Sequence, residues 1–150
     1  MNEMTIARVS DAPAADAQGS PFAMAIDVSG HHILGDEPAE MGGSNLGPAP
    51  FDLLTAALAE CTAMTVRWYA RQQGWPLDHV DVVVEHEKAA AEGHPGKIDV
   101  FRKSVSVTGD LTEEQIARLI GVAARCPVQK TLEGAVQIAT ASGDVSTAQA

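Results

Sequence analysis

Residues 50–73 read PFDLLTAALAECTAMTVRWYARQQ and predict one long helix. Pro50 suits the first helical position because its missing N–H would have no partner there. The stretch contains no glycine and no second proline before Gly74, a residue that favours the end of a helix. The first four turns are apolar nearly all round, which is typical of a helix covered on several sides. We therefore expect this helix at the centre of the fold, in a chain that forms a dimer.

Patterns typical of strands lie on both sides of this helix. Residues 4–9 read as a strand, a loop over 10–21 follows, and 22–28 with 31–34 form a predicted hairpin. A loop rich in glycine and proline then leads into the helix. After the helix, residues 79–86 and 98–107 have the composition and alternation of an antiparallel pair.

The last third of the chain predicts two helices and a final strand. Thr112 and Gln115 form a capping box that opens the first helix. Pro127 interrupts this helix and begins a short second one. Residues 135–140 (AVQIAT) read as a closing strand, and 141–150 as a flexible tail. The order of elements predicts an α+β fold with mostly antiparallel sheet.

Composition limits the class of protein and its partners. The chain has 150 residues, which fits a single domain over 1–150, and its 45% hydrophobic and 20% charged residues are ordinary for a globular protein. A formal net charge of −10 disfavours binding to nucleic acid or to an anionic membrane surface. The apolar run over 53–66 is too short to span a bilayer. The beginning of the chain lacks the pattern of a secretory signal, so we expect a cytoplasmic location.

Two cysteines, Cys61 and Cys126, are the only ones in the chain. Their spacing fits neither a dense disulfide framework nor a Cys-x-x-Cys metal site. The five histidines have no zinc-like spacing either, and we expect no metal and no other cofactor. In the cytoplasm two thiols normally stay reduced, so a disulfide between them would be transient and catalytic.

The two cysteines have different predicted surroundings. At about 100° per residue, Cys61 shares its side of the long helix with Leu54, Ala57, Leu58, Met64, Thr65 and Trp68. Such a thiol is either a small core residue or a nucleophile activated by another segment. Cys126 precedes Pro127, at or beside a helix N-cap, where helix N–H groups stabilise a thiolate. A capping position filled by chance is the alternative there.

A thiol peroxidase with two cysteines would use both residues. The Cys61 thiolate would attack a peroxide oxygen and become a sulfenic acid. Cys126 would then attack that sulfur, release water and form a disulfide.

The stretch GGSNLGPAPFDLLTAALAECTAMTVRWYA at 42–70, followed by RCPVQKTLE at 125–133, resembles the family of osmotically inducible and organic hydroperoxide resistance proteins. The resemblance implies a homodimer of intertwined α+β subunits with the long helices at its centre. It also implies that Cys61 is the peroxidatic and Cys126 the resolving cysteine. The implied substrates are organic hydroperoxides, and the implied reductants are dithiols such as lipoylated proteins.

The chain departs from this family where the first cysteine is activated. Well-characterised peroxidases of the family pair an arginine with a glutamate. The glutamate position falls on Phe51 here, and the loop over 10–20 has no arginine. We take as activating candidates Arg8, Asp52 and Glu60. We take as pocket candidates Phe51, Leu54, Leu58, Met64 and Thr65.

Two other functions stay open on these residues. One is a non-catalytic dimer that binds an apolar small molecule or senses redox state, which the replaced glutamate and missing arginine favour. The other is a structural domain with two inert thiols.

Overall fold

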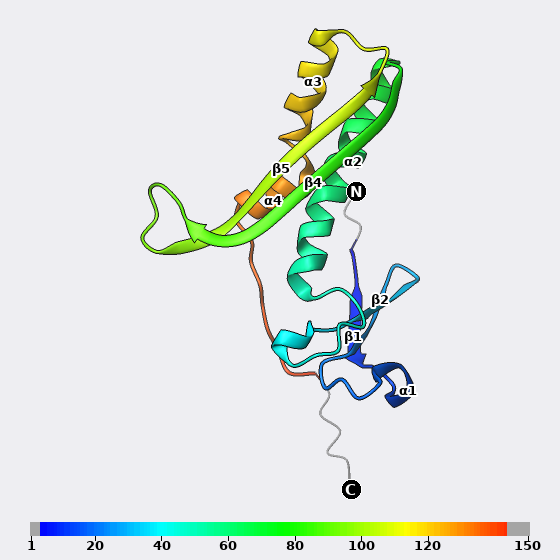
Figure 1. Cartoon of the computed structure of the whole chain (residues 1–150), viewed down its shortest axis with the longest axis vertical. Coiled ribbons are helices and arrows are strands. Elements are labelled where there is room, and N and C mark those ends of the chain that lie inside the picture. Colours follow the sequence, from blue (N-terminus) through cyan, green and yellow to red (C-terminus); the bar gives the residue numbers. More distant parts are fainter. Residues whose placement is uncertain (1–3, 144–150) are drawn as a thin grey trace, which may run out of the picture.

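The computed structural model describes residues 4–143 and has the predicted α+β fold, with two antiparallel sheets and one long helix (Figure 1). The elements in chain order are β1 (Ala7–Asp11), α1 (Ala14–Ala17), β2 (Met24–Val28), β3 (His31–Gly35), η1 (Ala39–Met41), α2 (Pro50–Gln73), β4 (Leu77–Ala90), β5 (Lys97–Gly109), α3 (Glu113–Ala123) and α4 (Pro127–Glu133). Within residues 4–143, no helix has the length and apolar character needed to cross a membrane.

Helix α2 has the predicted ends. It begins at Pro50, and the Asp52 carboxylate accepts a hydrogen bond of 2.9 Å from the N–H of Ala49 just before it. It ends at Gly74, whose φ of 70° is strained for residues with a side chain. Its fully buried residues repeat every four positions, at Leu58, Thr62, Val66 and Ala70. This stripe is the face that α2 turns towards the rest of the chain.

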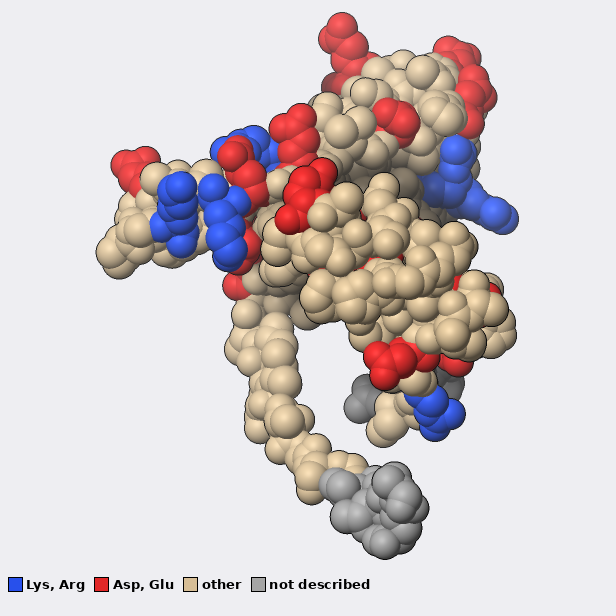
Figure 2. All heavy atoms as spheres, turned by 60° about the horizontal axis from the view of Figure 1, so that its bottom comes forward, with Lys and Arg blue, Asp and Glu red and all other residues tan. Residues whose placement is uncertain are grey.

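The opposite face of α2 is open in the single chain, where we expected cover on several sides. Met64 is 63% exposed and Trp68 61%. Strands β4 and β5 and helices α3 and α4 all pack on α2, but they do not enclose it. Figure 2 shows acidic side chains scattered over one side of the molecule, with broad uncharged areas between them.

The core lies where α2, α3 and the beginning of β4 meet. Its fully buried members are Val66, Ala70, Leu77, Leu119 and Ala123. The Arg67 guanidinium fastens the beginning of β4 to α2 by donating to the carbonyl oxygens of Leu77 at 2.7 Å and Asp78 at 3.2 Å. The capping box of Thr112 and Gln115 begins α3 as predicted.

The two sheets are separate within residues 4–143. Strands β4 and β5 form a long two-stranded ribbon that extends beyond both predicted strands. Strands β1, β2 and β3 form the other sheet, with the predicted hairpin turning at Ser29 and Gly30. The predicted first strand at 4–9 is shifted to Ala7–Asp11, and the predicted loop over 10–21 contains the short helix α1.

The predicted strand at 135–140 is wrong for this chain. Residues 135–143 follow α4 as an extended segment without regular structure (Figure 1). Val136 and Ile138 stay exposed, because no strand within residues 4–143 pairs with the segment. Strand composition alone does not make a strand without a partner. Residues 144–150 of the predicted tail lie outside the described part.

A buried carboxylate orders the loop before α2. Asp36 accepts hydrogen bonds from the Ser20 hydroxyl at 2.7 Å and from the N–H groups of Glu37, Ser44 and Leu46 at 2.8, 3.0 and 3.2 Å. Burial is the largest influence and raises the pKa of Asp36, but the four hydrogen bonds together outweigh it and lower that pKa below its ordinary value. The loop is therefore organised around a charged carboxylate and leads into α2 at Pro50.

Candidate functional site

The fold brings the two cysteines together. Cys61 lies on α2, and Cys126 is the N-cap of α4, with Pro127 at the first helical position. The Val128 N–H donates to Cys61 Sγ at 3.4 Å, and the Gln129 N–H donates to Cys126 Sγ at 3.4 Å. Both thiols are free, and Cys61 is one of the groups that lower the pKa of Cys126. Two residues far apart in the sequence therefore share one site.

A threonine and a lysine complete the surroundings of Cys126. Thr62, next to Cys61 on α2, has its hydroxyl oxygen 3.4 Å from Cys126 Sγ and 2.8 Å from the carbonyl oxygen of Leu58. Lys103 of β5 donates from Nζ to that hydroxyl oxygen at 3.0 Å and to the carbonyl oxygen of Ala123 at 2.6 Å. A positive charge is thus held one hydroxyl group away from the sulfur.

These contacts favour the ionised form of Cys126. Burial is the largest single influence and raises the pKa of this thiol, because it penalises the thiolate. The Thr62 hydroxyl, the Gln129 N–H and the Cys61 thiol, with the charge of Lys103, act in the other direction. Their sum lowers the pKa of Cys126 below its ordinary value.

The two sulfurs differ in access to solvent. Cys126 is completely buried, whereas Cys61 is partly exposed. A dissolved reagent therefore reaches Cys61 before Cys126. Exchange reactions of thiols depend on such access, so this arrangement suits an external reaction at Cys61 followed by an internal one at Cys126.

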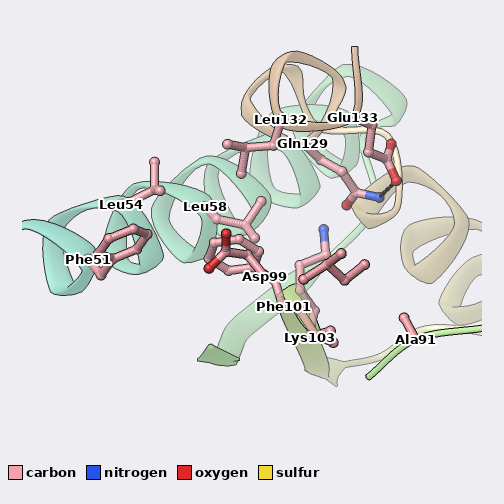
Figure 3. A pocket seen from close by; sticks show the side chains of 12 residues that line it. Phe51, Leu54, Leu58, Ala91, Asp99, Phe101, Lys103, Gln129, Leu132 and Glu133 are labelled. Atoms are coloured by element: carbon pink, nitrogen blue, oxygen red, sulfur yellow. Dashed lines mark hydrogen bonds between the residues drawn. The ribbon is translucent and has the colours of Figure 1, made fainter. Parts of the chain in front are cut away.

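A cavity of about 600 Å³ opens between α2, β5 and α4 (Figure 3). Its apolar lining comes from α2, β5 and α4 and consists of Phe51, Leu54, Leu58, Ile98, Val100, Phe101 and Leu132, with Ala91 at its edge. The Lys103 amine points into it in Figure 3, and Gln129 lines it from α4. Its volume is in the range of small-molecule sites, and the buried Gln129 Oε1 has no hydrogen-bond partner among residues 4–143. Neither sulfur is part of the lining.

Residues 42–141 match the sequence family described as OsmC-like protein. The chain belongs to the OsmC-like family. No curated protein sequence matches it significantly. The family match covers the loop before α2, both cysteines and the cavity.

Solved structures of OsmC-like proteins have the same fold. An OsmC-like protein from Mycoplasma pneumoniae superposes with a TM-score of 0.67 at 19% identity, over 89% of this chain and 90% of that one. An organic hydroperoxide resistance protein OsmC from Legionella pneumophila gives 0.64 at 21%, over 88% and 90%. The organic hydroperoxide resistance protein OhrB of Bacillus subtilis gives 0.55 at 22%, over 86% and 91%. At these identities the likeness shows the fold alone.

The activating candidates of this OsmC-like chain lie away from its sulfurs. Arg8 is in β1, opposite Asp27 of β2. Asp52 is bonded to the N-cap of α2, and Glu60 is exposed on that helix. Among the hydrogen bonds of residues 4–143, those to the two sulfurs come instead from Thr62, Val128 and Gln129.

Only some of the pocket candidates line the cavity. Phe51, Leu54 and Leu58 line the cavity, whereas Met64 belongs to a shallower hollow with Trp68, and Thr65 lines neither. The sequence reasoning missed Thr62, Lys103 and Gln129. The sequence did contain a clue to Lys103. It lies on the same, inward side of β5 as Phe101, Val105 and Val107, where a lysine is unusual.

Proposed function

We propose that this OsmC-like protein reduces organic hydroperoxides with its two cysteines. The observation that carries the proposal is that helix α4 donates adjacent N–H groups to both sulfurs, which places the thiols within reach of each other. The family match and the hydroperoxide resistance proteins among the structural relatives support this reaction class. Most of the cavity lining is aliphatic or aromatic, which supports a substrate with an apolar part, and its polar side chains are those of Asp99, Lys103, Gln129 and Glu133.

The reaction runs in two steps. The Cys61 thiolate attacks the terminal oxygen of the hydroperoxide, the O–O bond breaks, and the alcohol leaves with one proton while Cys61 becomes a sulfenic acid. The Cys126 thiolate then attacks the Cys61 sulfur, and hydroxide leaves as water after taking a proton. Two electrons have passed from the thiols to the peroxide.

A dithiol restores the enzyme by reducing the Cys61–Cys126 disulfide, and a lipoylated protein is the proposed donor. We also propose that the reaction takes place in the cytoplasm, where such a disulfide does not persist.

Mass spectrometry tests the reaction. Reduced wild-type protein mixed with an equal amount of cumene hydroperoxide should lose two hydrogens as the Cys61–Cys126 disulfide forms. Cys126→Ser should accumulate a sulfenic acid on Cys61, trapped with dimedone. Cys61→Ser should consume no peroxide above the buffer control. If Cys61→Ser consumes peroxide as fast as wild type, the proposal is wrong.

We propose further that the protein is a homodimer in which a second copy covers the open face of α2. The exposed Met64 and Trp68 lie side by side over a hollow that also includes Ala63 and Val80. A second copy offers the same face and buries both apolar surfaces. Sedimentation at micromolar concentration should give the mass of a dimer, and Trp68→Arg should give a monomer. A monomeric wild-type protein would refute this assembly.

A second function is favoured by one observation. Neither sulfur lines the cavity, so an apolar molecule bound there need not react with Cys61. In this case the protein binds an apolar small molecule, and the cysteines report redox state. Binding of a fluorescent fatty acid that is unchanged in Cys61→Ser, together with no peroxide consumption, would favour this function over the reductase.

A further inference from the structure

Lys103 occupies a position that the reaction above does not explain. It lies on the inward side of β5, and two of its three N–H groups have fixed acceptors, Thr62 Oγ1 and the carbonyl oxygen of Ala123. A lysine loses much side-chain entropy when it is held in this way. Its place next to the sulfurs therefore calls for a role.

The hydrogen bond from Lys103 restricts the direction of the Thr62 hydroxyl proton. Because the ammonium donates to Thr62 Oγ1, the hydroxyl proton must point away from Lys103. Its two available acceptors are the carbonyl oxygen of Leu58 at 2.8 Å and Cys126 Sγ at 3.4 Å. When Cys126 carries a negative charge, the sulfur becomes the stronger acceptor and the hydroxyl turns to it. The lysine charge thus reaches the sulfur through one hydroxyl group.

We propose that Lys103, acting through Thr62, is a positioning residue that stabilises the Cys126 thiolate and so decides which sulfur leaves when the disulfide is reduced. The proposal rests on the proposed hydroperoxide reduction and names a residue for its recycling step. The completely buried Cys126 is closed to an external dithiol, whereas the partly exposed Cys61 is open to it.

The recycling step follows from this arrangement. A thiolate of the external dithiol attacks Cys61 Sγ, a new S–S bond forms, and the Cys61–Cys126 bond breaks with its electron pair on Cys126. The second thiol of the reductant then attacks its own sulfur in the mixed disulfide, releasing Cys61 as a thiolate and the reductant as a cyclic disulfide. A leaving thiol of low pKa leaves faster. The lowered pKa of Cys126 agrees with this direction of cleavage.

The first test measures the Cys126 thiolate without any peroxide. Absorbance at 240 nm is followed against pH in reduced Cys61→Ser, where Cys126 is the remaining thiol. Adding Lys103→Met should raise the titration midpoint by about one pH unit, since a nearby opposite charge shifts a pKa by roughly one unit or more. Thr62→Val, which keeps the side-chain shape, should raise it in the same direction. Lys103→Arg and Thr62→Ser should restore most of the shift.

The matched control is Arg102→Met in the same background. Arg102 is the neighbour of Lys103 on β5, but its side chain is exposed and pairs with Glu87. It makes the same change in net charge without touching the site, so its midpoint should stay at that of Cys61→Ser. Far-UV circular dichroism checks that every variant is folded. If the Lys103→Met and Thr62→Val midpoints both stay within about 0.3 of the parent, or if Arg102→Met moves as far, Lys103 has no such role.

The second test measures the leaving step. The disulfide is formed with diamide in proteins that retain both cysteines, and its reduction by dithiothreitol is followed at pH 7. Lys103→Met should slow reduction severalfold, because the leaving thiol then has a higher pKa and leaves more slowly. An unchanged rate overturns the proposal.

The two proposals fail in different ways. If wild-type protein forms no disulfide with hydroperoxide, the reductase proposal fails, while the titration and the diamide experiment still judge Lys103. If the midpoint does not move in an enzyme that consumes peroxide normally, only the role of Lys103 fails.

Discussion

Gly47→Ala should destabilise this fold more than alanine at any other glycine before α2. Gly47 lies in the loop that the buried Asp36 organises, directly against strand β3. A Cβ atom at this position would lie 1.7 Å from the carbonyl oxygen of Leu34 and 2.6 Å from its carbonyl carbon. The obstacle is backbone, so no side-chain rotation can relieve it.

The size of the effect follows from the movement required. Real Cβ atoms essentially never approach closer than 3.0 Å, so the loop and β3 must separate by about 1.3 Å. This separation strains the hydrogen bond of 3.3 Å from the Asp36 N–H to the carbonyl oxygen of Pro48. Overpacking of a well-packed site costs roughly 1–3 kcal/mol, and an obstacle made of backbone places Gly47→Ala at about 3 kcal/mol. For a chain of this length the melting temperature should fall by about 6–12 °C.

Urea unfolding of the reduced protein, followed by circular dichroism at a fixed protomer concentration, measures the change. Gly121→Ala is the matched control, because Gly121 is in the interior of α3 and a Cβ there meets nothing within 4 Å. That variant should gain about 0.5–1 kcal/mol from helix propensity. If Gly47→Ala loses less than about 1 kcal/mol, the close approach to Leu34 does not constrain the loop.

Two further predictions concern charge and capping. Asp36→Asn should destabilise the protein at neutral pH, and the gap to wild type should be constant above about pH 5, since the unfolded carboxyl titrates near 3.9. The pKa of Asp36 is lowered in the folded state, so the stability that its carboxylate contributes is lost as the pH falls through that lower value. Urea unfolding from pH 7 to pH 3 should therefore show the difference in unfolding free energy between wild type and variant becoming smaller. A difference that grows in acid contradicts the assignment. Thr112→Ala should lower the free energy of unfolding by about 1 kcal/mol, because the hydroxyl caps the Gln115 N–H at 3.1 Å. Thr112→Ser keeps the hydroxyl and should lose much less, and equal losses for the two variants would show that the cap does not matter.

The elements with clear local signals were predictable from the sequence. Pro50 and Gly74 mark the ends of α2, and the Thr112 capping box marks the beginning of α3. One proline was enough to place Cys126 at an N-cap. These signals act within a few residues of where they occur, so no tertiary information was needed.

Features that depend on distant partners were not predictable in the same way. The strand expected at 135–140 has suitable residues, but a strand exists only where another pairs with it. The sequence reasoning looked for activating groups at the family's positions and beside Cys61. Lys103 instead lies on β5, 41 residues beyond Thr62 in the sequence. Only the fold of the ribbon over α2 brings them together. The inward position of Lys103 was visible in the alternation of β5, yet its target was not.

The beginning of α4 links the redox state of the sulfurs to backbone motion. Pro127 has no N–H group, and the next two N–H groups of this helix, those of Val128 and Gln129, donate hydrogen bonds to the sulfurs of Cys61 and Cys126. A thiolate accepts such bonds strongly, and a disulfide sulfur accepts them weakly. If the proposed disulfide forms, we therefore expect the first turn of this seven-residue helix, which has no buried residue, to loosen. Amide exchange in that turn would then speed up when the disulfide forms, and the exposed segment after Glu133 would follow it.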